Sequence, residues 1–405
     1  MRIVVQKYGG SSVATVEKLR SVAEKVVNTR RSGVGVVVVV SAMGDTTDDL
    51  LQLVREVSES PSRREMDMLL SVGERISMAL LSIAIQNLGE EAISLTGSQC
   101  GILTTHSHAN ARIVDVRPFR VQDELEAGRI VIVAGFQGTS YKREVTTLGR
   151  GGSDTTAVAL AAALGAEHCD IYSDVPGVFS ADPRIVPDAT RLAELSYEEM
   201  QEMARQGARV LNAQAVEFAR ERRIAIHARA TSGDGEGTVI RRIDPDADAR
   251  VRQLRNFGAR GVAGRRDLVL LSYEVPSSGE NRGPDMLDEL DGFDLLLANS
   301  VPGLSRLDIL ATTENVPDAP SRLRALQQRY PDTLTIQRDL GSASVIGLGI
   351  GEHPGAMLRL HRTLEAEALP LTMTFTAREA ITAVLPVHHV ERAQRLLHAA
   401  FIEAD

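Results

Sequence analysis

The sequence contains no tryptophan, and only 3% of its 405 residues are aromatic. A groove for single-stranded nucleic acid would need aromatic side chains on which bases can stack. Basic residues are also outnumbered, with 45 Lys and Arg against 54 Asp and Glu, which gives a formal net charge of −9. Proteins that bind a phosphate backbone carry the opposite balance. We therefore expect no nucleic acid among the partners.

Cysteines and long apolar runs are scarce as well. Cys100 and Cys169 are the only cysteines, too few for a disulfide framework, so we expect two buried thiols in a reducing compartment. The longest apolar runs, residues 34–40 and 158–164, are too short to cross a bilayer, and the first residues lack the apolar core of a signal peptide. These absences predict a soluble, cytoplasmic protein with no membrane partner.

What is present resembles a globular protein of two or three domains, with 43% hydrophobic and 24% charged residues. Over the first 230 residues, short β-branched runs alternate with helical stretches. This alternation predicts an α/β domain with a mainly parallel sheet. The expected strands are residues 3–6, 36–40, 130–134 and 169–173, and the expected helices are residues 13–29, 155–164 and 198–222.

The composition changes near residue 232. Residues 232–252 are polar and rich in turn formers, which indicates a linker. Two shorter cycles of strand, helix and strand follow, over residues 267–330 and 342–401. Two similar α+β units in tandem suggest an internal duplication.

Three loops carry more glycine and hydroxyl groups than a plain turn requires. In residues 7–12, glycines would let the backbone approach a phosphate and Lys7 would add positive charge. The alternative is an ordinary strand-to-helix turn. Residues 41–47 follow the valine-rich strand, at the sheet edge where α/β proteins bind ligands. There the alternative is that Thr46 or Thr47 simply caps a helix.

The third loop, residues 147–154, places Arg150 inside a glycine-rich turn before a helix. This arrangement suits a bound carboxylate or phosphate better than it suits packing. His106 and His108 lie in a polar loop with no acidic or thiol residue nearby in the sequence. We therefore predict no metal site there.

At these loops the sequence resembles the aspartate kinases of the amino acid kinase family, and most of all the actinobacterial forms. The matching blocks occur in the family's order. They are residues 7–13, 41–48, 71–77, 133–138, 147–156, 172–179 and 182–184.

The resemblance implies a three-layer α/β/α sandwich followed by two α+β, ferredoxin-like ACT domains. The implied boundaries are a catalytic domain at 1–240, a linker at 241–254, and ACT-like domains at 255–340 and 341–405. In this family one ACT unit is inserted into the other, so a strand near residues 257–263 is expected. ACT units associate edge to edge, which implies a homo-oligomer.

The implied reaction moves the γ-phosphoryl group of ATP, with Mg²⁺ as cofactor, to the β-carboxylate of L-aspartate, giving 4-phospho-L-aspartate. A carboxylate is already ionised at neutral pH, so no strong base is required. The enzyme has to hold two anions together and neutralise the charge of the moving group.

The family's roles carry over to matching residues. Lys7, Arg150 and Asp154 would be catalytic, with Asp154 orienting Lys7 or the substrate ammonium. The substrate would be bound by Thr47, Glu74, Arg150, Gly151, Gly152, Ser153 and Asp154, with Arg150 on its α-carboxylate and Glu74 on its ammonium. The nucleotide would contact Lys7, Tyr8, Gly9, Gly10, Ser41, Ser173, Asp174, Phe179, Asp182, Arg184 and Arg209. No protein ligand for the metal is assigned.

Some positions depart from the family pattern. Phe179 and Arg209 stand where the family usually has tyrosine and lysine, which predicts an altered nucleotide affinity. Residues 275–283 replace an effector-binding Asp-x-Pro-Gly turn, Ala298–Asn299 replaces a Gln-Asn pair, and residues 374–376 replace a Ser-Thr-Ser segment, whereas a Pro-Gly turn remains at 354–355. We predict weak inhibition by lysine or threonine and a role in a dedicated secondary pathway. The alternative is an unrecognised effector.

Two other functions stay open on the sequence. One is a kinase for another amino acid carboxylate, against which Thr47, Glu74, Arg150 and Ser153 argue. The other is a non-catalytic regulatory subunit built on ACT pairing. The retained Lys7 and the complete loop of residues 149–154 argue against that reading.

Overall fold

The structure is a computed structural model, and it describes residues 1–59, 61–149, 151–208, 210–233, 235–243, 256–274, 283–301, 306–314, 316 and 318–403. The chain divides into two compact units. Unit 1 comprises Met1–Phe179, Thr190–Arg205 and Arg209–Pro245, and unit 2 comprises Ser180–Ala189, Gln206–Ala208 and Asp246–Asp405.

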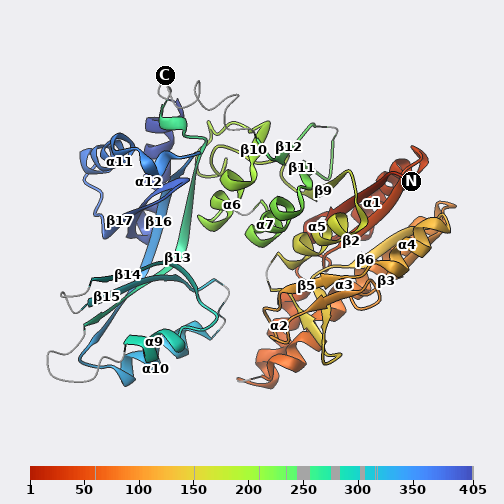
Figure 1. Ribbon diagram of the computed structural model, residues 1–405, viewed down its shortest axis with the longest axis horizontal. Helices are drawn as coiled ribbons and strands as arrows, with labels where there is room; N and C mark the ends of the chain where they lie inside the picture. The colour runs from red at the N-terminus through yellow and green to blue at the C-terminus, as the bar shows by residue number, and fades with distance from the viewer. Residues whose placement is uncertain are drawn as a thin grey trace. The chain divides into compact units, whose positions relative to one another are not determined.

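Unit 1 is built on a sheet that has eight strands within the described residues (Figure 1). Its neighbouring strands are parallel except for β11 and β12, as the alternating sequence predicted. In spatial order they are β10 (Glu194–Ser196), β12 (Thr238–Arg241), β11 (Ala225–Ala230), β9 (His168–Ser173), β1 (Ile3–Tyr8), β2 (Gly35–Val40), β6 (Ile130–Ala134) and β3 (Ala92–Leu95).

The central strands are buried on both faces, which explains their unbroken apolar sequences. All six residues of β2 are buried. Helices α1 (Val16–Arg31) and α3 (Arg63–Asn87) pack on one face, against Val36, Val38 and Val40. Alternate residues point to the other face, where the alanine-rich α5 (Gly152–Leu164) packs on β1, β2 and β9. The unit is thus the expected three-layer sandwich.

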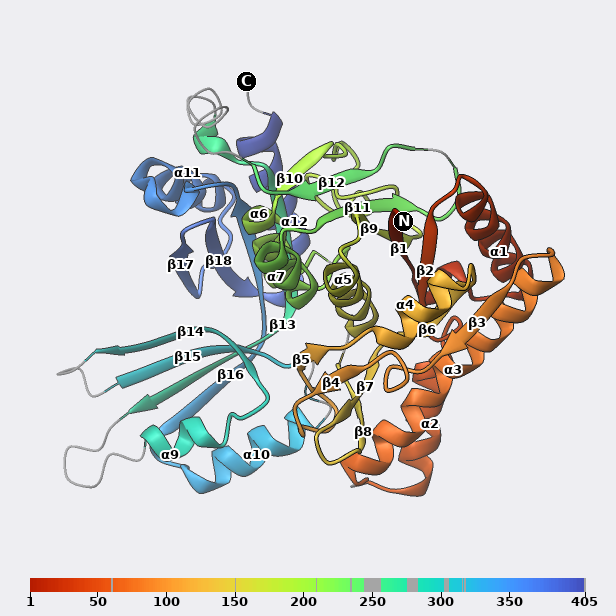
Figure 2. The same cartoon turned by 45° about the vertical axis from the view of Figure 1, so that its right-hand side comes forward.

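Of the remaining elements of unit 1, α7 packs beside α5, α4 packs on β6, and β8 contacts α3 (Figure 2). A second, four-stranded sheet has the order β5-β4-β7-β8. Its strands are β4 (Ile102–Thr104), β5 (Ile113–Val116), β7 (Gln137–Ser140) and β8 (Val145–Thr147), and the other helices of the unit are α2 (Thr46–Val57), α4 (Phe119–Glu126), α6 (Tyr197–Arg205) and α7 (Ala213–Arg222).

The single helix that we predicted over residues 198–222 was wrong, because the structure has two helices there, α6 and α7. Gly207 between them has φ of +106°, a conformation that ends a helix. Asn212 then caps α7, its side chain accepting hydrogen bonds from the backbone of Gln214 and Ala215. The apolar periodicity continues across the break and conceals it.

Helix α3 also departs from our expectation about apolar runs. It has the length and composition of a membrane span, although half of its most apolar window is buried inside the protein. A helix that packs on a central sheet passes the same test.

Unit 2 contains a sheet of six strands in the described residues, in the order β14-β15-β13-β16-β18-β17. The strands are antiparallel: β13 (Gly261–Glu274), β14 (Asp294–Val301), β15 (Arg306–Thr312), β16 (Leu334–Ile346), β17 (Met373–Ala377) and β18 (Ala380–Pro386). In the part of unit 2 that the structure describes, the α-helices are α9 (Gly283–Asp288), α10 (Ala319–Arg329), α11 (Pro354–Ala366) and α12 (Val390–His398).

Two apolar cores divide this sheet. Val262 of β13 packs with α11 and α12, whereas Val269 and Leu271 of the same strand pack with α9 and α10. The register against β16 shifts between Arg265 and Leu268, where one core gives way to the other. One long strand therefore serves both α+β halves, which is the type of sharing that ACT insertion implies.

Candidate active site

The first predicted loop begins at the carboxyl end of β1 with a buried ion pair. The Nζ atom of Lys7 lies 2.6 Å from Oδ1 of Asp154, and both side chains are about nine-tenths buried. Lys7 comes from β1 and Asp154 from the first turn of α5. The sheet edge and the start of α5 therefore meet at a shielded positive charge.

Gly10 allows the first and second loops to pack against one another. A Cβ atom on Gly10 would lie 2.8 Å from the carbonyl oxygen of Ala42. The backbone N–H of Gly44 donates a hydrogen bond of 3.1 Å to the carbonyl of Gly10. Residue 10 must therefore be glycine for the carboxyl ends of β1 and β2 to hold this arrangement.

Glu74 of α3 points its carboxylate at the same edge. Gly73 brings the helix close, since a Cβ there would lie 2.8 Å from the Cβ of Ala42. Oε1 of Glu74 accepts a hydrogen bond of 3.1 Å from the N–H of Ala42, whereas Oε2 is buried and accepts none. Burial raises the pKa of Glu74 to about 7, although the Ala42 amide acts in the opposite direction. The site thus offers a buried carboxylate oxygen without a cation.

The third loop reaches this region through Gly135, which follows β6. A Cβ on Gly135 would lie 2.7 Å from Oγ of Ser153. Gly151, with φ of +73°, is the N-cap of α5. The N–H of Gly152 donates to the carbonyl of Gly149 at 3.1 Å. The next amide, that of Ser153, lies beside β6, at a helix N-terminus that favours an anion.

A second group of predicted nucleotide contacts, Ser173 and Asp174, lies at the carboxyl end of β9. The N–H of Gly9 donates to the carbonyl of Tyr172 at 3.1 Å, which joins this strand end to the Lys7 loop. Thr231 donates from its hydroxyl to the carbonyl of Ser173 at 2.9 Å. Asp174 follows and is exposed.

Other predicted residues of unit 1 lie around these loops. Ser41 and Thr47 are half-buried, at the end of β2 and in the first turn of α2, and Phe179 is half-buried beyond β9. Tyr8 is fully buried and stacks on Tyr172 with a centroid distance of 4.8 Å. Its side chain cannot face a ligand there, so any contact with a nucleotide would come from its backbone.

Four predicted site residues cannot be placed at the candidate site of unit 1. Asp182 and Arg184 belong to unit 2, where they form an ion pair of 2.7 Å with each other. Arg150 and Arg209 lie outside the described residues. Their roles as substrate clamp and nucleotide contact stay predictions.

Sequence reasoning missed Asp67, a fully buried residue of α3. Its carboxylate accepts hydrogen bonds of 2.6 Å from the hydroxyl of Thr147 and 3.0 Å from the N–H of Ala109, and lies 2.6 Å from Nδ1 of His108. Asp67 therefore ties the third loop to the helix that carries Glu74. His108 has an acidic partner, but that partner lies 41 positions away in the sequence, which the local pattern could not reveal.

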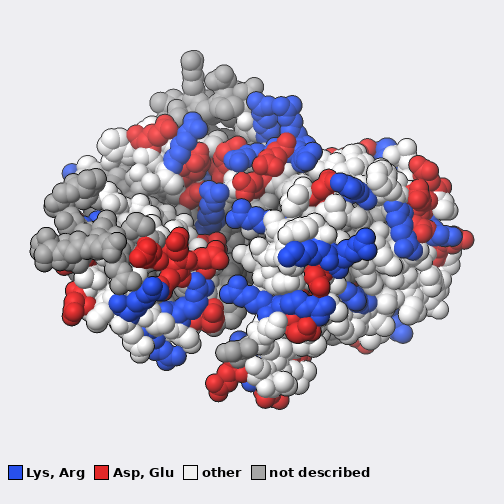
Figure 3. Space-filling model, turned by 60° about the horizontal axis from the view of Figure 1, so that its bottom comes forward, with Lys and Arg blue, Asp and Glu red and all other residues white. Residues whose placement is uncertain are grey.

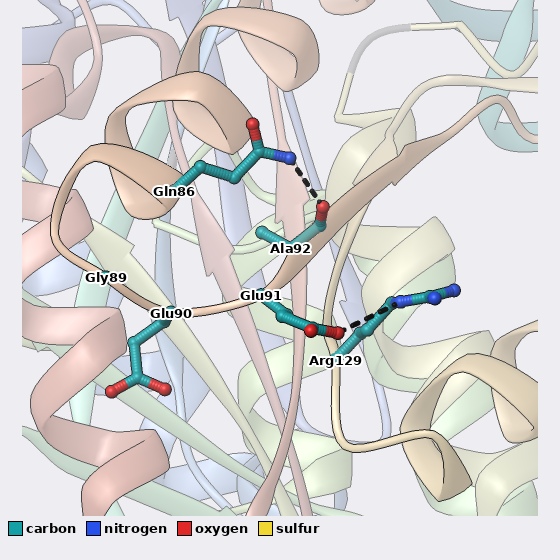
Figure 4. Close-up of a pocket in the computed structure, with 6 residues that line it drawn as sticks. All are labelled: Gln86, Gly89, Glu90, Glu91, Ala92 and Arg129. Carbon is teal, nitrogen blue, oxygen red and sulfur yellow. Dashed lines mark hydrogen bonds and ion pairs between the residues drawn. The ribbon is translucent and has the colours of Figure 1, made fainter.

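A pocket of about 500 Å³ lies elsewhere, at the amino ends of β3 and β6. Figure 4 shows the carboxylate of Glu91 directed at Arg129 and the amide of Gln86 directed at the carbonyl of Ala92. It is lined by Gln86, Gly89, Glu90, Glu91, Ala92 and Arg129. These side chains largely satisfy one another and lie at the sheet edge opposite Lys7, so this pocket is not the candidate active site.

Basic and acidic side chains are interspersed on the face shown in Figure 3. The Lys7 ammonium of the candidate site is instead internal, where it pairs with Asp154 in the first turn of α5. The arrangement can hold a phosphoryl group near the cation and amides, and an ammonium group near Glu74.

Comparison with known proteins agrees with this arrangement. The model of the "Amino acid kinase family" matches residues 2–229. The aspartokinase of Mycolicibacterium smegmatis is 44% identical over 410 residues, covering 99% of this chain and 96% of that protein. Aspartokinase 2 of Bacillus subtilis is 39% identical, covering 99% and 98%.

A solved structure of Escherichia coli aspartokinase III in complex with aspartate and ADP superposes with a TM-score of 0.83. It is 22% identical, and the match covers 98% of this chain and 99% of that one, so it supports the fold alone. The chain belongs to the amino acid kinase family. Within that family it belongs to the aspartokinases, the class of ATP-dependent aspartate kinases.

Proposed function

We propose that this protein transfers the γ-phosphoryl group of ATP to the β-carboxylate of L-aspartate and forms 4-phospho-L-aspartate. The observation that carries the proposal is the convergence of Lys7 and Asp154, Glu74 and the α5 N-terminus at one sheet edge. Each group meets one electrostatic need of the reaction.

Transfer requires a β-carboxylate oxygen of aspartate to attack the γ-phosphorus while the bond from that phosphorus to the β–γ bridging oxygen breaks. The electron pair of the broken bond leaves with ADP, and no proton has to move. Lys7 stabilises negative charge on the transferred group, and Asp154 holds the Lys7 ammonium in place. Asp154 is thus a positioning residue and not a general base.

Glu74 supplies the counter-charge for the substrate. Its Oε2 atom accepts no hydrogen bond although it is buried, a costly state for an ionised carboxylate. The α-ammonium of aspartate would satisfy it. Gly151, Gly152 and Ser153 would present backbone and hydroxyl donors to the substrate, with Arg150 on the α-carboxylate and Thr47 as a further hydroxyl contact.

The nucleotide would bind along the loops after β1, β2 and β9. Gly9 and Gly10 would keep side chains away from the phosphates, and Ser41, Ser173 and Asp174 lie at the ends of the neighbouring strands. Mg²⁺ supplies charge neutralisation on the phosphates and would be held mainly by their oxygens and by water. The site fits such an ion because its cation and amides are placed for phosphate, with no carboxylate cage.

The test is hydroxylamine trapping of the acyl phosphate, with ATP and aspartate, glutamate or an aspartate analogue as substrate. We expect an aspartyl hydroxamate to form fastest. Faster trapping of another amino acid would change the substrate. No ATP turnover with any of them would favour the non-catalytic subunit.

For regulation, we propose weak inhibition by lysine and threonine, and service to a dedicated secondary pathway. Ala298 and Asn299, at the position of the family's Gln-Asn pair, are exposed on β14. Ala298 has no side-chain amide that could form hydrogen bonds with an effector amino acid. His353 precedes the retained Pro-Gly turn at the start of α11, while residues 275–282 lie outside the described residues. Strong inhibition of the purified protein by millimolar lysine plus threonine would refute this proposal.

A homo-oligomer formed through unit 2 is also proposed. Strands β14 and β17 form the edges of the sheet within the described residues, and unpaired strand edges favour pairing with another copy. Sedimentation velocity of the full chain measures this directly, and a monomer at micromolar concentration would contradict it. A cytoplasmic location stays a prediction.

A further inference from the structure

A second cluster of titratable side chains lies on unit 1, away from the Lys7 loop. His168 and Asp170 come from β9 and His227 from β11, two neighbouring parallel strands in which His227 is the register partner of Asp170. Side chains two residues apart on a strand share one face. These residues share the face of Tyr172, whereas Lys7 points to the opposite face with α5.

The three side chains are spaced as ligands of one small cation. Nε2 of His168 lies 3.4 Å from Oδ2 of Asp170, and Nδ1 of His227 lies 3.5 Å from Oδ1 of Asp170. The three ligand atoms all lie within 4.8 Å of one another. Bonds of about 2.0–2.1 Å to a tetrahedral Zn²⁺ place neighbouring ligand atoms roughly 3.4 Å apart.

One oxygen of the Asp170 carboxylate, Oδ1, has no hydrogen-bond partner. The residue is 4% exposed, and its Oδ1 atom accepts no hydrogen bond. The Nε atom of Arg229 lies 3.5 Å away and is itself without a hydrogen-bond partner. A buried carboxylate oxygen facing this cluster therefore lacks a good partner, which points to a ligand.

The state of His227 points the same way. Nη2 of Arg229 lies 3.1 Å from Nδ1 of His227. A guanidinium group can only donate hydrogen bonds, so Nδ1 must be the unprotonated nitrogen. Its lone pair and the Asp170 oxygen thus face one cationic position, which Arg229 fills imperfectly.

The cluster is open to an ion from solution. The side chains of His168 and His227 are 24% and 19% exposed, and that of Arg229 is 35% exposed. The imidazole rings are stacked with centroids 4.3 Å apart. They have to rotate to aim both lone pairs at one ion, and Arg229 has to swing into solvent.

We propose that His168, Asp170 and His227 form a binding site for a divalent transition metal of the zinc type, with water as the fourth ligand. Two imidazoles and one carboxylate suit Zn²⁺, Co²⁺ or Ni²⁺ and are a poor set for Mg²⁺, which prefers oxygen ligands. The site links β9 to β11. It is separate from the Mg²⁺ that accompanies ATP.

Co²⁺ titration of the metal-free full chain tests the proposal, because tetrahedral Co²⁺ absorbs visibly. Calorimetry with Zn²⁺ gives the affinity. We expect one Co²⁺ per chain with tetrahedral bands. The variants His168→Gln and His227→Gln should each bind at least tenfold more weakly, since even outer-shell changes cost about 10–100-fold.

The matched control is His388→Gln, which alters another adjacent histidine pair, His388 and His389, whose rings lie 4.1 Å apart. It should leave the bands and the Zn²⁺ affinity unchanged. Arg229→Gln should bind Zn²⁺ about tenfold more tightly, because it removes a competing positive charge. A gain of affinity cannot result from misfolding, so this variant tests the site even if the histidine variants are unstable.

Three results would overturn the proposal. They are the absence of tetrahedral bands in the wild-type chain, unchanged binding in both His168→Gln and His227→Gln, and loss of binding in His388→Gln alone. None of them depends on kinase activity, so the metal site and the proposed reaction stand or fall separately.

Discussion

Unit 1 contains two carboxylates that are almost equally buried and electrostatically opposite. Glu74 is 3% exposed and Asp170 is 4% exposed. Burial raises the pKa of Glu74 to about 7, against the smaller opposing effects of its own backbone N–H and of the Ala42 amide. Burial alone would also raise the pKa of Asp170, but His168, His227 and Arg229 hold it well below its usual value. The donors and positive charges around a carboxylate, and not its depth alone, therefore decide which protonation state is favoured before a ligand binds.

The comparison separates the two regions by what they lack. The Lys7 region holds its cation tightly and leaves Glu74 without one, so it is prepared for a substrate that brings an ammonium group. In the Asp170 region the two histidines and Arg229 already favour the ionised carboxylate from 3.4–3.5 Å, so a metal ion there has to displace Arg229.

The largest expected effect is that of Lys7→Met. Removing the buried ammonium takes away charge stabilisation of the transferred phosphoryl group, and we expect kcat to fall about 10³-fold. Steady-state kinetics by hydroxamate formation measures this. Lys142→Met, which removes an exposed lysine, is the control and should retain full activity. A fall of less than tenfold for Lys7→Met would remove Lys7 from the mechanism.

Glu74→Gln should weaken the binding of aspartate and leave the binding of ATP unchanged. Loss of a charged hydrogen bond to the substrate ammonium costs about 1.5–3 kcal/mol, so KM for aspartate should rise roughly 10–100-fold. KM for ATP should change little. Equal changes in both constants would indicate a disturbed fold and contradict the assignment of Glu74 to the ammonium.

Gly135→Ala tests whether the third loop is positioned by close backbone packing. The added Cβ would lie 2.7 Å from Oγ of Ser153 and would push the start of α5 away from β6. Misplacement of this size lowers kcat/KM by about 10–100-fold. Gly235→Ala is the control, because nothing lies within 4 Å of its Cβ position. Wild-type kcat/KM for Gly135→Ala would show that the contact is not needed.

The pKa of Glu74 predicts how aspartate binding depends on pH. Below about pH 7 the free enzyme carries a neutral Glu74, which cannot pair with an ammonium group. KM for aspartate should therefore rise about tenfold for each unit by which the pH falls below 7. In Glu74→Gln this slope should vanish. A slope that persists in the variant would assign the titration to another group.

Much of the fold could be predicted because strands and helices alternate at lengths set by local sequence. The end of β2 and the three glycine-rich loops could be placed for the same reason. The helix break at Gly207 could not be placed, since it depends on one backbone conformation within a continuous helical pattern. Sequence periodicity does not predict the φ angle of a single residue.

The missed side-chain clusters have a different cause. His227 meets Asp170 only through the pairing of β9 with β11, and Asp67 meets Thr147 across 80 positions. Strand order and register fix the contact of His227 with Asp170, where a one-residue slip would send the side chain to the other face. The packing of α3 against β8 fixes the contact of Asp67 with Thr147. Loop motifs are local in sequence, whereas these clusters exist only in three dimensions.

The smallest expected effect is on stability, from Asp170→Asn measured in EDTA so that no metal contributes. The ionised Asp170 is favoured by its neighbours in the folded state, so at pH 8 the variant should lose about 1–3 kcal/mol of unfolding free energy. Because the folded pKa is lowered, this contribution is present above the unfolded value near 4 and is lost as the pH falls further. The difference from wild type in urea denaturation should therefore shrink below pH 4. The control is Asp115→Asn, which breaks an exposed ion pair with Arg117 and should lose much less unfolding free energy. Equal losses of unfolding free energy in both variants would contradict the contrast between buried and exposed ion pairs.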